Sequence, residues 1–214
     1  MKIIVASNNE HKIKEIKAIL SDLDVEIRSL KDEGIDVDPE ETGATFMENA
    51  LIKARTIYEA VRAKERKTKR EEGAGKDKKG HAVLVLADDS GLSVDYLNGA
   101  PGVFSARYAG RHGDDRANNE KLLADLAGVP LEERKAKFVC AMALVGHKVD
   151  LRVTGEAKGY IIEEAKGFEG FGYDPLFFSN DLAKTFAEAS GVEKNSVSHR
   201  GRALAKLRKE LVNL

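Results

Sequence analysis

The sequence predicts an α/β fold in which helices flank a mixed, twisted β-sheet. Short runs rich in Val, Ile and Leu alternate with longer segments whose apolar residues recur at helical spacing. Two strand-like runs are also joined closely enough to form a hairpin. Because 214 residues suffice for one sizeable core, we expect a single domain over residues 1–214, with room for two lobes about a cleft.

In the N-terminal half, changes in the spacing of apolar residues indicate where strands and helices begin. A short apolar run gives way to polar residues, and then Ile13, Ile16 and Ile19 recur at helical spacing. Thr45 and Glu48 match a capping box ahead of a long helix. The expected elements are a strand at 2–6, a helix from about 13, a second strand, an acidic loop at 31–43, a long helix and a strand at 82–86.

In the C-terminal half, glycine and proline separate shorter runs. Gly91 is expected to turn the chain, so that one strand ends before it and another begins after it. The expected elements are a strand at 92–97, a helix at 115–127, hairpin strands at 137–145 and 149–154 about Gly146, a segment at 155–170, a short strand after Pro175, a helix around 184–189 and a terminal helix capped by Ser196 or Ser198.

A charged segment at residues 62–80 connects the long helix to the strand at 82–86. Its first part, rich in Arg, Lys and Glu, is expected to extend the helix, whereas residues 73–80 are expected to form a solvated loop. Such a run is usually solvated surface. Its mixed charge makes a nucleic-acid tether the less favoured interpretation.

The composition argues against several classes of protein. Lys and Arg together number 35 and Asp and Glu 36, so the net charge of −1 provides no general attraction to nucleic acid or to a membrane surface. No apolar run is long enough to span a bilayer, and the chain begins on a strand rather than on a signal-type segment. A single cysteine, Cys140, rules out an internal disulfide framework. We therefore expect a cytoplasmic protein with neither a stable nucleic-acid partner nor a membrane partner.

Two adjacent carboxylates, Asp88 and Asp89, follow the strand at 82–86. In open α/β sheets ligands bind beyond the carboxyl ends of strands, and carboxylates there can hold a metal ion. Because successive strand side chains point to opposite faces, at most one of the pair should enter a given site. The competing interpretation is an ordinary Asp-Asp-Ser-Gly turn, capped by Asp88, with Asp89 solvated.

Polar residues between the first strand and the first helix form a candidate anion site. Ser7, Asn8 and Asn9 are all favourable N-caps, and the free N–H groups of a helix start bind anions, with Lys12 and Lys14 adding positive charge. A triphosphate would fit there. The chain has no Walker pattern at this point, and an ordinary capped amphipathic helix is the competing interpretation.

Acidic residues precede the long helix. Most of them are expected to serve only the helix dipole and solubility. Paired with one of the strand aspartates, however, Glu40 or Glu41 could complete an all-oxygen site for magnesium, which takes one or two carboxylates and leaves other positions to water and phosphate. Lys53 lies on the helix that follows.

Two segments near the C-terminus could bind a base. Residues 167–175 combine glycines, which let backbone approach a ligand, with aromatic rings that could stack on a base or fold back into the core. Lys194, His199 and Arg200 offer donors for phosphate or for a carbonyl oxygen of a base. A histidine at a helix start is, however, more often structural.

Six separated blocks cover nearly the whole chain. They are Ser7-Asn8-Asn9-Glu10-His11-Lys12, Glu40-Glu41-Thr42-Gly43, Ala87-Asp88-Asp89-Ser90-Gly91-Leu92, Gly99-Ala100-Pro101-Gly102-Val103-Phe104-Ser105-Ala106-Arg107-Tyr108, Gly170-Phe171-Gly172-Tyr173-Asp174-Pro175 and Ser198-His199-Arg200-Gly201. In this order and approximate spacing they resemble the Ham1/RdgB family of inosine and xanthosine triphosphate pyrophosphatases. The segment at 62–80 is longer than the connection usual in that family.

The resemblance implies a fold and an activity. The fold would be an elongated sheet with the active cleft between two lobes, in a homodimer. The activity would be magnesium-dependent hydrolysis of dITP, ITP and XTP to the monophosphate and pyrophosphate, which keeps deaminated purines out of DNA and RNA.

The resemblance also implies roles for individual residues. By position, Asp89 resembles the catalytic acidic residue, described as a proton acceptor and also placed at the metal. Glu40 resembles the other metal ligand, with Glu41 beside it as the alternative. The residues expected to bind substrate are Ser7, Asn8, Asn9, Glu10, His11, Lys12, Lys53, Ser90, Phe171, Gly172, Tyr173, Asp174, Lys194, His199 and Arg200.

The chemistry of the residues agrees with this interpretation. Cleavage between the α and β phosphates needs a water at the α-phosphorus and cations on the departing pyrophosphate. Donors near His199 and Arg200 would favour the six-carbonyl of hypoxanthine or xanthine over the amino group of adenine. A non-catalytic nucleotide-binding protein on the same scaffold is the alternative function, and a nucleic-acid binder acting through residues 62–79 is the third.

Overall fold

The computed structural model describes residues 1–71 and 83–212, and in this part of the chain it contains one seven-stranded sheet of order β2-β1-β3-β4-β5-β6-β7. The strands are β1 (Lys2–Val5), β2 (Glu26–Ser29), β3 (Val83–Val94), β4 (Lys135–Gly146), β5 (Val149–Ile161), β6 (Phe177–Ser179) and β7 (Lys184–Thr185). The helices are α1 (Glu10–Ile19), α2 (Phe46–Glu71), α3 (Asp115–Asp125), α4 (Gly191–Val197) and α5 (His199–Leu211), with 3-10 turns η1 (Asp95–Leu97), η2 (Gly102–Arg107), η3 (Leu131–Glu133) and η4 (Phe186–Glu188).

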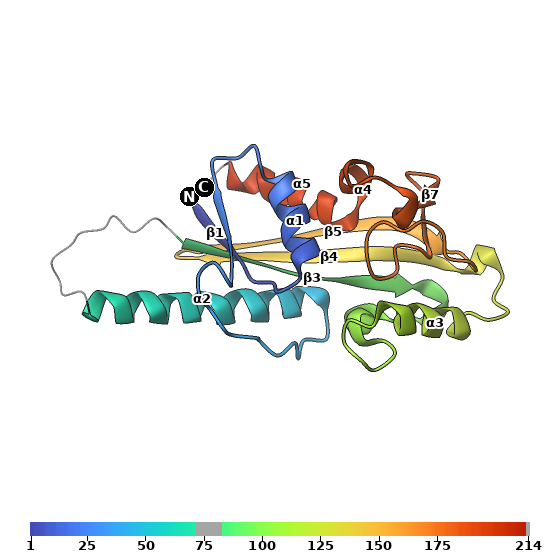
Figure 1. Ribbon diagram of the computed structural model, residues 1–214, viewed down its shortest axis with the longest axis horizontal. Helices are drawn as coiled ribbons and strands as arrows, with labels where there is room; N and C mark the ends of the chain where they lie inside the picture. Colours follow the sequence, from blue (N-terminus) through green and yellow to red (C-terminus); the bar gives the residue numbers. More distant parts are fainter. Residues whose placement is uncertain (72–82, 213–214) are drawn as a thin grey trace.

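The sheet is mixed, as predicted. β1 runs parallel to β2 and β3, and the remaining neighbours are antiparallel. Figure 1 shows the long strands β3, β4 and β5 running along the long axis of the molecule, with α1 and α5 along one side and α2, which extends beyond the ends of the strands, along the other. None of the helices in the described ranges combines the length and the apolarity needed to cross a membrane.

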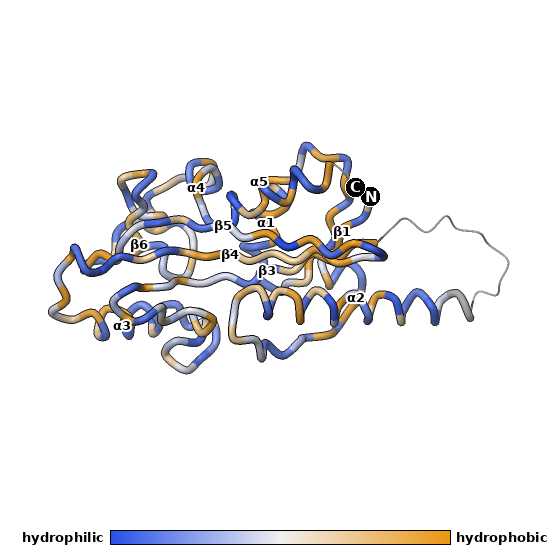
Figure 2. The backbone as a smooth tube through the Cα atoms, turned by 180° about the vertical axis from the view of Figure 1, so that it is seen from behind, coloured by the Kyte–Doolittle hydropathy of each residue, from blue (hydrophilic) through white to orange (hydrophobic). Residues whose placement is uncertain are grey.

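Apolar side chains gather in three clusters. One lies between α1, α5 and the face of β3 and β4 that carries Leu86 and Met142, and a second lies under α2 on the opposite face, around Val85 and Ala143. The third, around Phe138 and neighbouring aromatic rings, is at the far end of the sheet with α3. Figure 2 shows the apolar colouring concentrated on the strands near β1. The first two clusters therefore hold one lobe together and the third holds the other.

The prediction of a turn at Gly91 is wrong. β3 is one continuous strand of 12 residues that passes through Asp88, Asp89 and Gly91, and β4 pairs with it from Val85 to Val94. The unbroken partner strand supplies the backbone hydrogen bonds that override the local turn preference of Asp-Asp-Ser-Gly. Gly91 is required for close packing instead, since a Cβ there would lie 2.3 Å from the Ser105 Oγ of η2.

The predicted hairpin is confirmed, and it is longer than expected. β4 and β5 pair from Lys135 with Tyr160 to Gly146 with Val149, so the strand also takes in the first part of the segment at 155–170, as far as Ile161. Lys148 takes a positive φ of 61° in the two-residue turn. These two strands join the lobes.

The predicted helix at 184–189 is wrong. Residues Lys184–Thr185 form β7 and Phe186–Glu188 form a 3-10 turn, because Thr185 and Glu188 make a capping box that ends the strand at once. A helix not expected from the sequence, α4, follows after a second capping box between Ser190 and Glu193.

Three predictions about helix ends are confirmed. Asn9 is the N-cap of α1, Ser198 is the N-cap of α5, and Thr45 and Glu48 exchange hydrogen bonds at the start of α2. The charged segment extends α2 to Glu71, as expected. The predicted loop at 73–80 lies outside the described residues.

Candidate active site

A cleft of about 810 Å³ opens where the two lobes meet. Its walls come from the loop before α1, the acidic loop, the middle of β3, η2 and the segments around Phe171 and α5. Glu10 is exposed in the first turn of α1 and is not among the lining residues. The other residues predicted from the sequence all line this cavity: Ser7, Asn8, Asn9, His11, Lys12, Glu40, Glu41, Lys53, Asp89, Ser90, Phe171, Gly172, Tyr173, Asp174, Lys194, His199 and Arg200.

The middle of β3 forms the floor of the cleft. β1 ends at Val5, opposite Leu86, so β3 continues past its parallel neighbour. Asp88 and Asp89 are the second and third residues after that point. A ligand site beyond the carboxyl end of a strand is therefore present, but the strand that ends is β1 and not the one that carries the aspartates.

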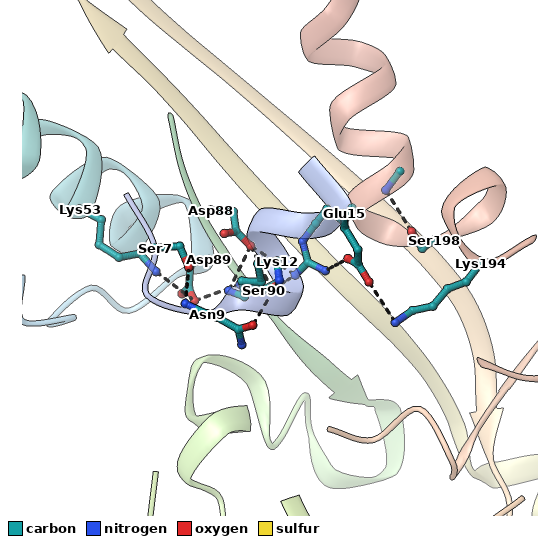
Figure 3. A network of polar contacts seen from close by, with 12 residues as sticks. Ser7, Asn9, Lys12, Glu15, Lys53, Asp88, Asp89, Ser90, Lys194 and Ser198 are labelled. Carbon is teal, nitrogen blue, oxygen red and sulfur yellow. Dashed lines mark hydrogen bonds and ion pairs between the residues drawn. The ribbon is translucent and has the colours of Figure 1, made fainter. Parts of the chain in front are cut away.

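Asp88 points toward α1 and α5. Its Oδ2 lies 3.1 Å from Lys12 Nζ and 3.4 Å from an Arg200 amino group, as Figure 3 shows in part. Burial alone would raise the pKa of this carboxyl, but the charges of Lys12, Arg200 and Lys53 outweigh burial and hold the pKa well below its usual range. Asp88 is thus a permanent anion that joins two cations from distant segments.

Asp89 points to the opposite face, toward α2, as the alternation of strand side chains requires. Its Oδ2 accepts a hydrogen bond of 3.0 Å from Asn49 Nδ2, and its Oδ1 accepts one of 3.0 Å from the Ser90 N–H. Burial, with a contribution from Glu41, raises the pKa of Asp89 although Lys53 opposes the change. The negative charge on Asp89 is therefore less compensated than the charge on Asp88.

Lys53 lies between two carboxylates. Its Nζ is 2.7 Å from Glu41 Oε1 and 3.9 Å from Asp89 Oδ1. Burial would lower the pKa of Lys53, but the carboxylates of Asp88, Asp89 and Glu41 raise it, so the amine stays protonated. Glu40 also lines the cleft but is exposed.

The cleft contains carboxylate oxygens, which are the kind of ligand that magnesium prefers. Within residues 1–71 and 83–212, no three His, Cys, Asp or Glu side chains stand as a ready-made metal cluster. Magnesium, however, is usually held by only one or two carboxylates, with water and substrate phosphate completing its shell. Glu41 and Asp89 supply two carboxylates in one cavity, and the only cation within 4 Å of Asp89 among the described residues is Lys53, at 3.9 Å.

The loop before α1 forms one end of the cleft. Asn9 Oδ1 accepts a hydrogen bond of 3.2 Å from the Lys12 N–H, while the Asn9 N–H donates one of 3.2 Å to Ser7 Oγ. Figure 3 shows Ser7 and Asn9 on this loop close to Asp89 and Ser90 of β3. The start of α1 therefore faces the floor of the cleft.

The other end of the cleft contains paired charges and an aromatic ring. Lys194 Nζ lies 2.7 Å from Asp174 Oδ2, which also accepts the Phe171 N–H at 2.9 Å. The Phe171 ring stacks on His11 at a centroid distance of 5.3 Å, and Lys194 Nζ lies 4.9 Å from its centroid. His11 and Phe171 thus meet across the cleft from segments far apart in the sequence.

His199 and Arg200 keep free hydrogen-bonding groups beside this ring. Burial, with the charges of Arg200 and Lys194, holds the pKa of His199 well below its usual value, so the imidazole is neutral. His199 stacks on Phe138, and its Nδ1 has no partner in the described residues. Arg200 pairs with Glu15 and donates to Ser90 Oγ at 3.0 Å, while its Nε is also without a partner. Buried unpaired polar atoms are costly, which points to a ligand.

Tyr173 and Gly172 hold the walls rather than face a ligand freely. The Tyr173 ring is buried in the cluster at the far end of the sheet, and its hydroxyl donates to Ser105 O at 2.8 Å. The Gly172 N–H donates to Asp115 Oδ2 at 2.7 Å, at a positive φ of 63°. The interpretation that aromatic rings of this segment fold back into the core is thus correct for Tyr173.

Two residues of the site were not expected from the sequence, Glu15 and Asn49. Glu15 is the partner of both Lys194 and Arg200, and Asn49 is the partner of Asp89. A signal was present, because residues three or four apart share a helix face. Glu15 follows Lys12 by three residues and Asn49 precedes Lys53 by four.

Comparison with known proteins gives a consistent result. A model of the Ham1 family matches residues 3–210. The chain is 51% identical over 211 residues to a dITP/XTP pyrophosphatase of Clostridium perfringens, covering 98% of this chain and 97% of that protein. It is 52% identical over 210 residues to a protein of the same name from Clostridium tetani, covering 98% and 95% of the two chains. The solved structure of the Staphylococcus aureus Ham1 protein superposes with a TM-score of 0.81 at 37% identity, covering 100% of this chain and 99% of that one.

Proposed function

Because the chain belongs to the Ham1 family, we propose that it hydrolyses non-canonical purine nucleoside triphosphates, dITP, ITP and XTP, to the monophosphate and pyrophosphate. The protein is a nucleoside triphosphate pyrophosphatase, and its role is to keep deaminated purines out of nucleic acids. The observation that carries this proposal is a single cleft with a helix start at one end, carboxylates and a lysine in the middle, and unpaired donors beside an aromatic ring at the other. This order matches that of a nucleotide.

The phosphate end is assigned to the loop before α1. The N–H groups at a helix start favour anions, and the side chains of Lys12 and Lys53 add positive charge next to Asp88 and Asp89. Both lysines are held by these carboxylates, so they are in position before the substrate arrives. Such prior positioning lowers the entropic cost of binding a flexible polyphosphate.

The reaction centre is assigned to Asp89, with Glu41 and Lys53. Asn49 and the Ser90 N–H fix the Asp89 carboxylate, and its raised pKa suits either acceptance of a proton from the attacking water or contact with a metal ion. We propose Glu41, rather than the more exposed Glu40, as the second carboxylate, because Glu41 pairs with the same Lys53 that lies beside Asp89. A bound magnesium ion would neutralise charge on the phosphates and make the attacking water more acidic.

The base end is assigned to Phe171, His199 and Arg200. Phe171 offers a ring face, and the free Nε–H of Arg200 can donate to a carbonyl oxygen. Hypoxanthine and xanthine carry such an oxygen at position six, where adenine carries an amino group. Because the wrong base leaves buried donors unpaired, discrimination can reach as much as ~10⁴-fold.

A substrate panel tests this function. Purified protein is incubated with ITP, dITP, XTP and ATP, with and without magnesium, and pyrophosphate and the monophosphate are measured. We expect magnesium-dependent pyrophosphate release from the first three and little from ATP. Binding of ITP without turnover would instead indicate a non-catalytic nucleotide-binding protein and would overturn the proposal.

The Asp89→Asn variant tests the assignment of the reaction centre. Loss of a proton acceptor or metal-binding carboxylate should reduce kcat by roughly 10²- to 10⁴-fold. Asp24→Asn, at an exposed carboxylate before β2, is the matched control and should retain wild-type rates. Equal rates for Asp89→Asn and the wild type would remove Asp89 from the catalytic step.

The homodimer implied by the resemblance and the cytoplasmic location expected from the composition are proposals of the same kind. Light scattering coupled to size-exclusion chromatography should give twice the mass of one chain. Cell fractionation should place the protein in the cytoplasm.

A further inference from the structure

We propose that Arg107 is a substrate-binding residue that holds the pyrophosphate part of the nucleotide from the wall of the cleft formed by η2. The proposal rests on the function proposed above. It starts from the position of Arg107, at the last residue of η2, where it lines the same cavity as Lys12, Lys53 and Asp89.

Arg107 shares a carboxylate with Lys53. Glu41 Oε1 lies 2.7 Å from Lys53 Nζ, and Glu41 Oε2 lies 4.0 Å from an amino group of Arg107. The two cations therefore reach the same carboxylate from opposite walls of the cleft, one from α2 and one from η2. An anion that enters between these walls meets both.

Arg107 makes a longer contact with a protein carboxylate than Lys53 does, and its side chain is more exposed. Lys53 is close to two carboxylates and its side chain is 13% exposed, whereas Arg107 is at the limit of an ion pair and is 33% exposed. A guanidinium group offers several donors in a planar fork that matches two phosphate oxygens. Arg107 therefore keeps N–H groups available for a ligand, whereas the amines of Lys53 and Lys12 are already paired with carboxylates.

The backbone under Arg107 is fixed. Ser105 Oγ accepts the Leu92 N–H at 2.9 Å and donates to Gly102 O at 2.6 Å, which ties η2 to β3. The Tyr173 hydroxyl donates to Ser105 O from the other side. This platform keeps the start of the Arg107 side chain at a constant distance from β3.

The Arg107 side chain is also restricted. Its guanidinium carbon lies 5.3 Å from the centroid of the Phe104 ring, a cation–π contact that limits the directions it can take. A cation held in place on one wall loses less freedom when it binds phosphate. The residue is thus suited to hold the pyrophosphate as it leaves.

Product binding tests the proposal. Inhibition constants for inorganic pyrophosphate and for IMP are measured at saturating magnesium with wild type, Arg107→Gln, Arg107→Lys and the control Arg111→Gln. Arg111 is an exposed cation on the loop that follows η2, and it does not line the cleft. Isothermal titration with pyrophosphate gives a second readout that does not depend on turnover.

In Arg107→Gln we expect pyrophosphate to bind roughly tenfold more weakly, the loss of a charge-assisted hydrogen bond, with IMP binding unchanged. Arg107→Lys should recover part of the loss, and Arg111→Gln should behave as wild type. Unfolding midpoints equal to wild type would show that the variants are folded.

Two results would overturn the proposal. One is equal weakening of pyrophosphate and IMP binding. The other is that Arg107→Gln binds pyrophosphate as wild type does but requires a higher magnesium concentration. That result would mean that Arg107 only positions the Glu41 carboxylate. Failure of the proposed function is distinguishable, since the wild type would then release no pyrophosphate from ITP or XTP whatever Arg107 binds.

Discussion

Two neighbouring aspartates point to the two faces of β3, and their pKa values are shifted in opposite directions. Asp88 is fully buried between Lys12 and Arg200, and its pKa is held well below the usual range. Asp89, on the other face, accepts hydrogen bonds from neutral donors, and burial raises its pKa. Identical side chains one residue apart therefore differ because of their partners. The carboxylate paired with two cations through its Oδ2 holds the walls of the cleft together, whereas the less compensated one remains available for chemistry.

The largest test of this comparison is the stability of Asp88→Asn. Removal of this charge leaves Lys12 without this carboxylate and leaves the buried Arg200 paired with Glu15 alone, which should cost about 3–5 kcal/mol of unfolding free energy. Urea denaturation at neutral pH measures the difference. The matched variant is Asp89→Asn, whose stability should equal or exceed that of the wild type, because the charge removed is poorly compensated. Equal losses in the two variants would show that the two carboxylates contribute alike to stability.

Gly91 tests how closely η2 packs on the face of β3 that carries Asp89, because it lies two residues beyond Asp89 on that face. A Cβ at Gly91 would lie 2.3 Å from Ser105 Oγ and 2.7 Å from Gly102 O, so η2 must shift. We expect Gly91→Ala to cost about 1–3 kcal/mol and to weaken substrate binding, as measured by denaturation and KM. Gly191→Ala is the control, since nothing lies within 4 Å of a Cβ there. If both variants were as stable as wild type, the proposed close packing of η2 on β3 would be incorrect.

Asn49 defines the environment of Asp89 from α2. Its amide donates to Asp89 Oδ2 at 3.0 Å and accepts the Gly43 N–H at 2.8 Å, which links the acidic loop to β3. Asn49→Ala should therefore cost about 1–3 kcal/mol, because buried polar groups lose their partners. Thermal unfolding of this variant is compared with that of Thr56→Ala, at an exposed position on the same helix. A loss no greater than the loss in the control would argue against this link.

The smallest change that we expect is in how the unfolding free energy depends on pH. The pKa of Asp89 in the folded protein is raised above its ordinary value of 3.8. The negative charge of Asp89 therefore opposes folding fully at a pH above the raised pKa, and this effect disappears below pH 3.8. The stability advantage of Asp89→Asn should therefore be present at neutral pH and disappear as the pH falls toward 3.8. Asp88 has the opposite sign: its contribution is full above 3.8 and is lost as the pH falls further. Unfolding free energies measured from pH 7 to pH 3 check both directions.

The local pattern of the sequence was a good guide wherever local forces decide. Helical spacing around Ile16, the cap at Asn9 and the hairpin about residues 147–148 all appear in the structure. The local pattern failed where a distant segment decides. β3 continues through Asp88 to Gly91 because β4 pairs with it, and that pairing cannot be read from residues 88–91 alone.

The candidate site shows the same limit. Asp89, Lys53, Lys194 of α4 and Arg200 of α5 could be named from the sequence, because carboxylates, lysines and arginines are the side chains that bind metal ions and phosphates. Glu15 and Asn49 were missed although they share helix faces with Lys12 and Lys53, because a single carboxylate or amide on an amphipathic helix is usually solvated. Only the meeting of α1 with α5, and of α2 with β3, reveals what these two side chains hold.

The length of β3, β4 and β5 has a mechanical consequence. These strands run without interruption from one lobe to the other, so the lobes are not joined by a short flexible linker. A cleft between such lobes cannot swing open about a few hinge residues. It can widen only if the shared ribbon of strands bends or changes its twist, which deforms many hydrogen bonds slightly instead of a few dihedral angles greatly. Entry of the nucleotide and departure of its products should then depend on the stiffness of the sheet itself.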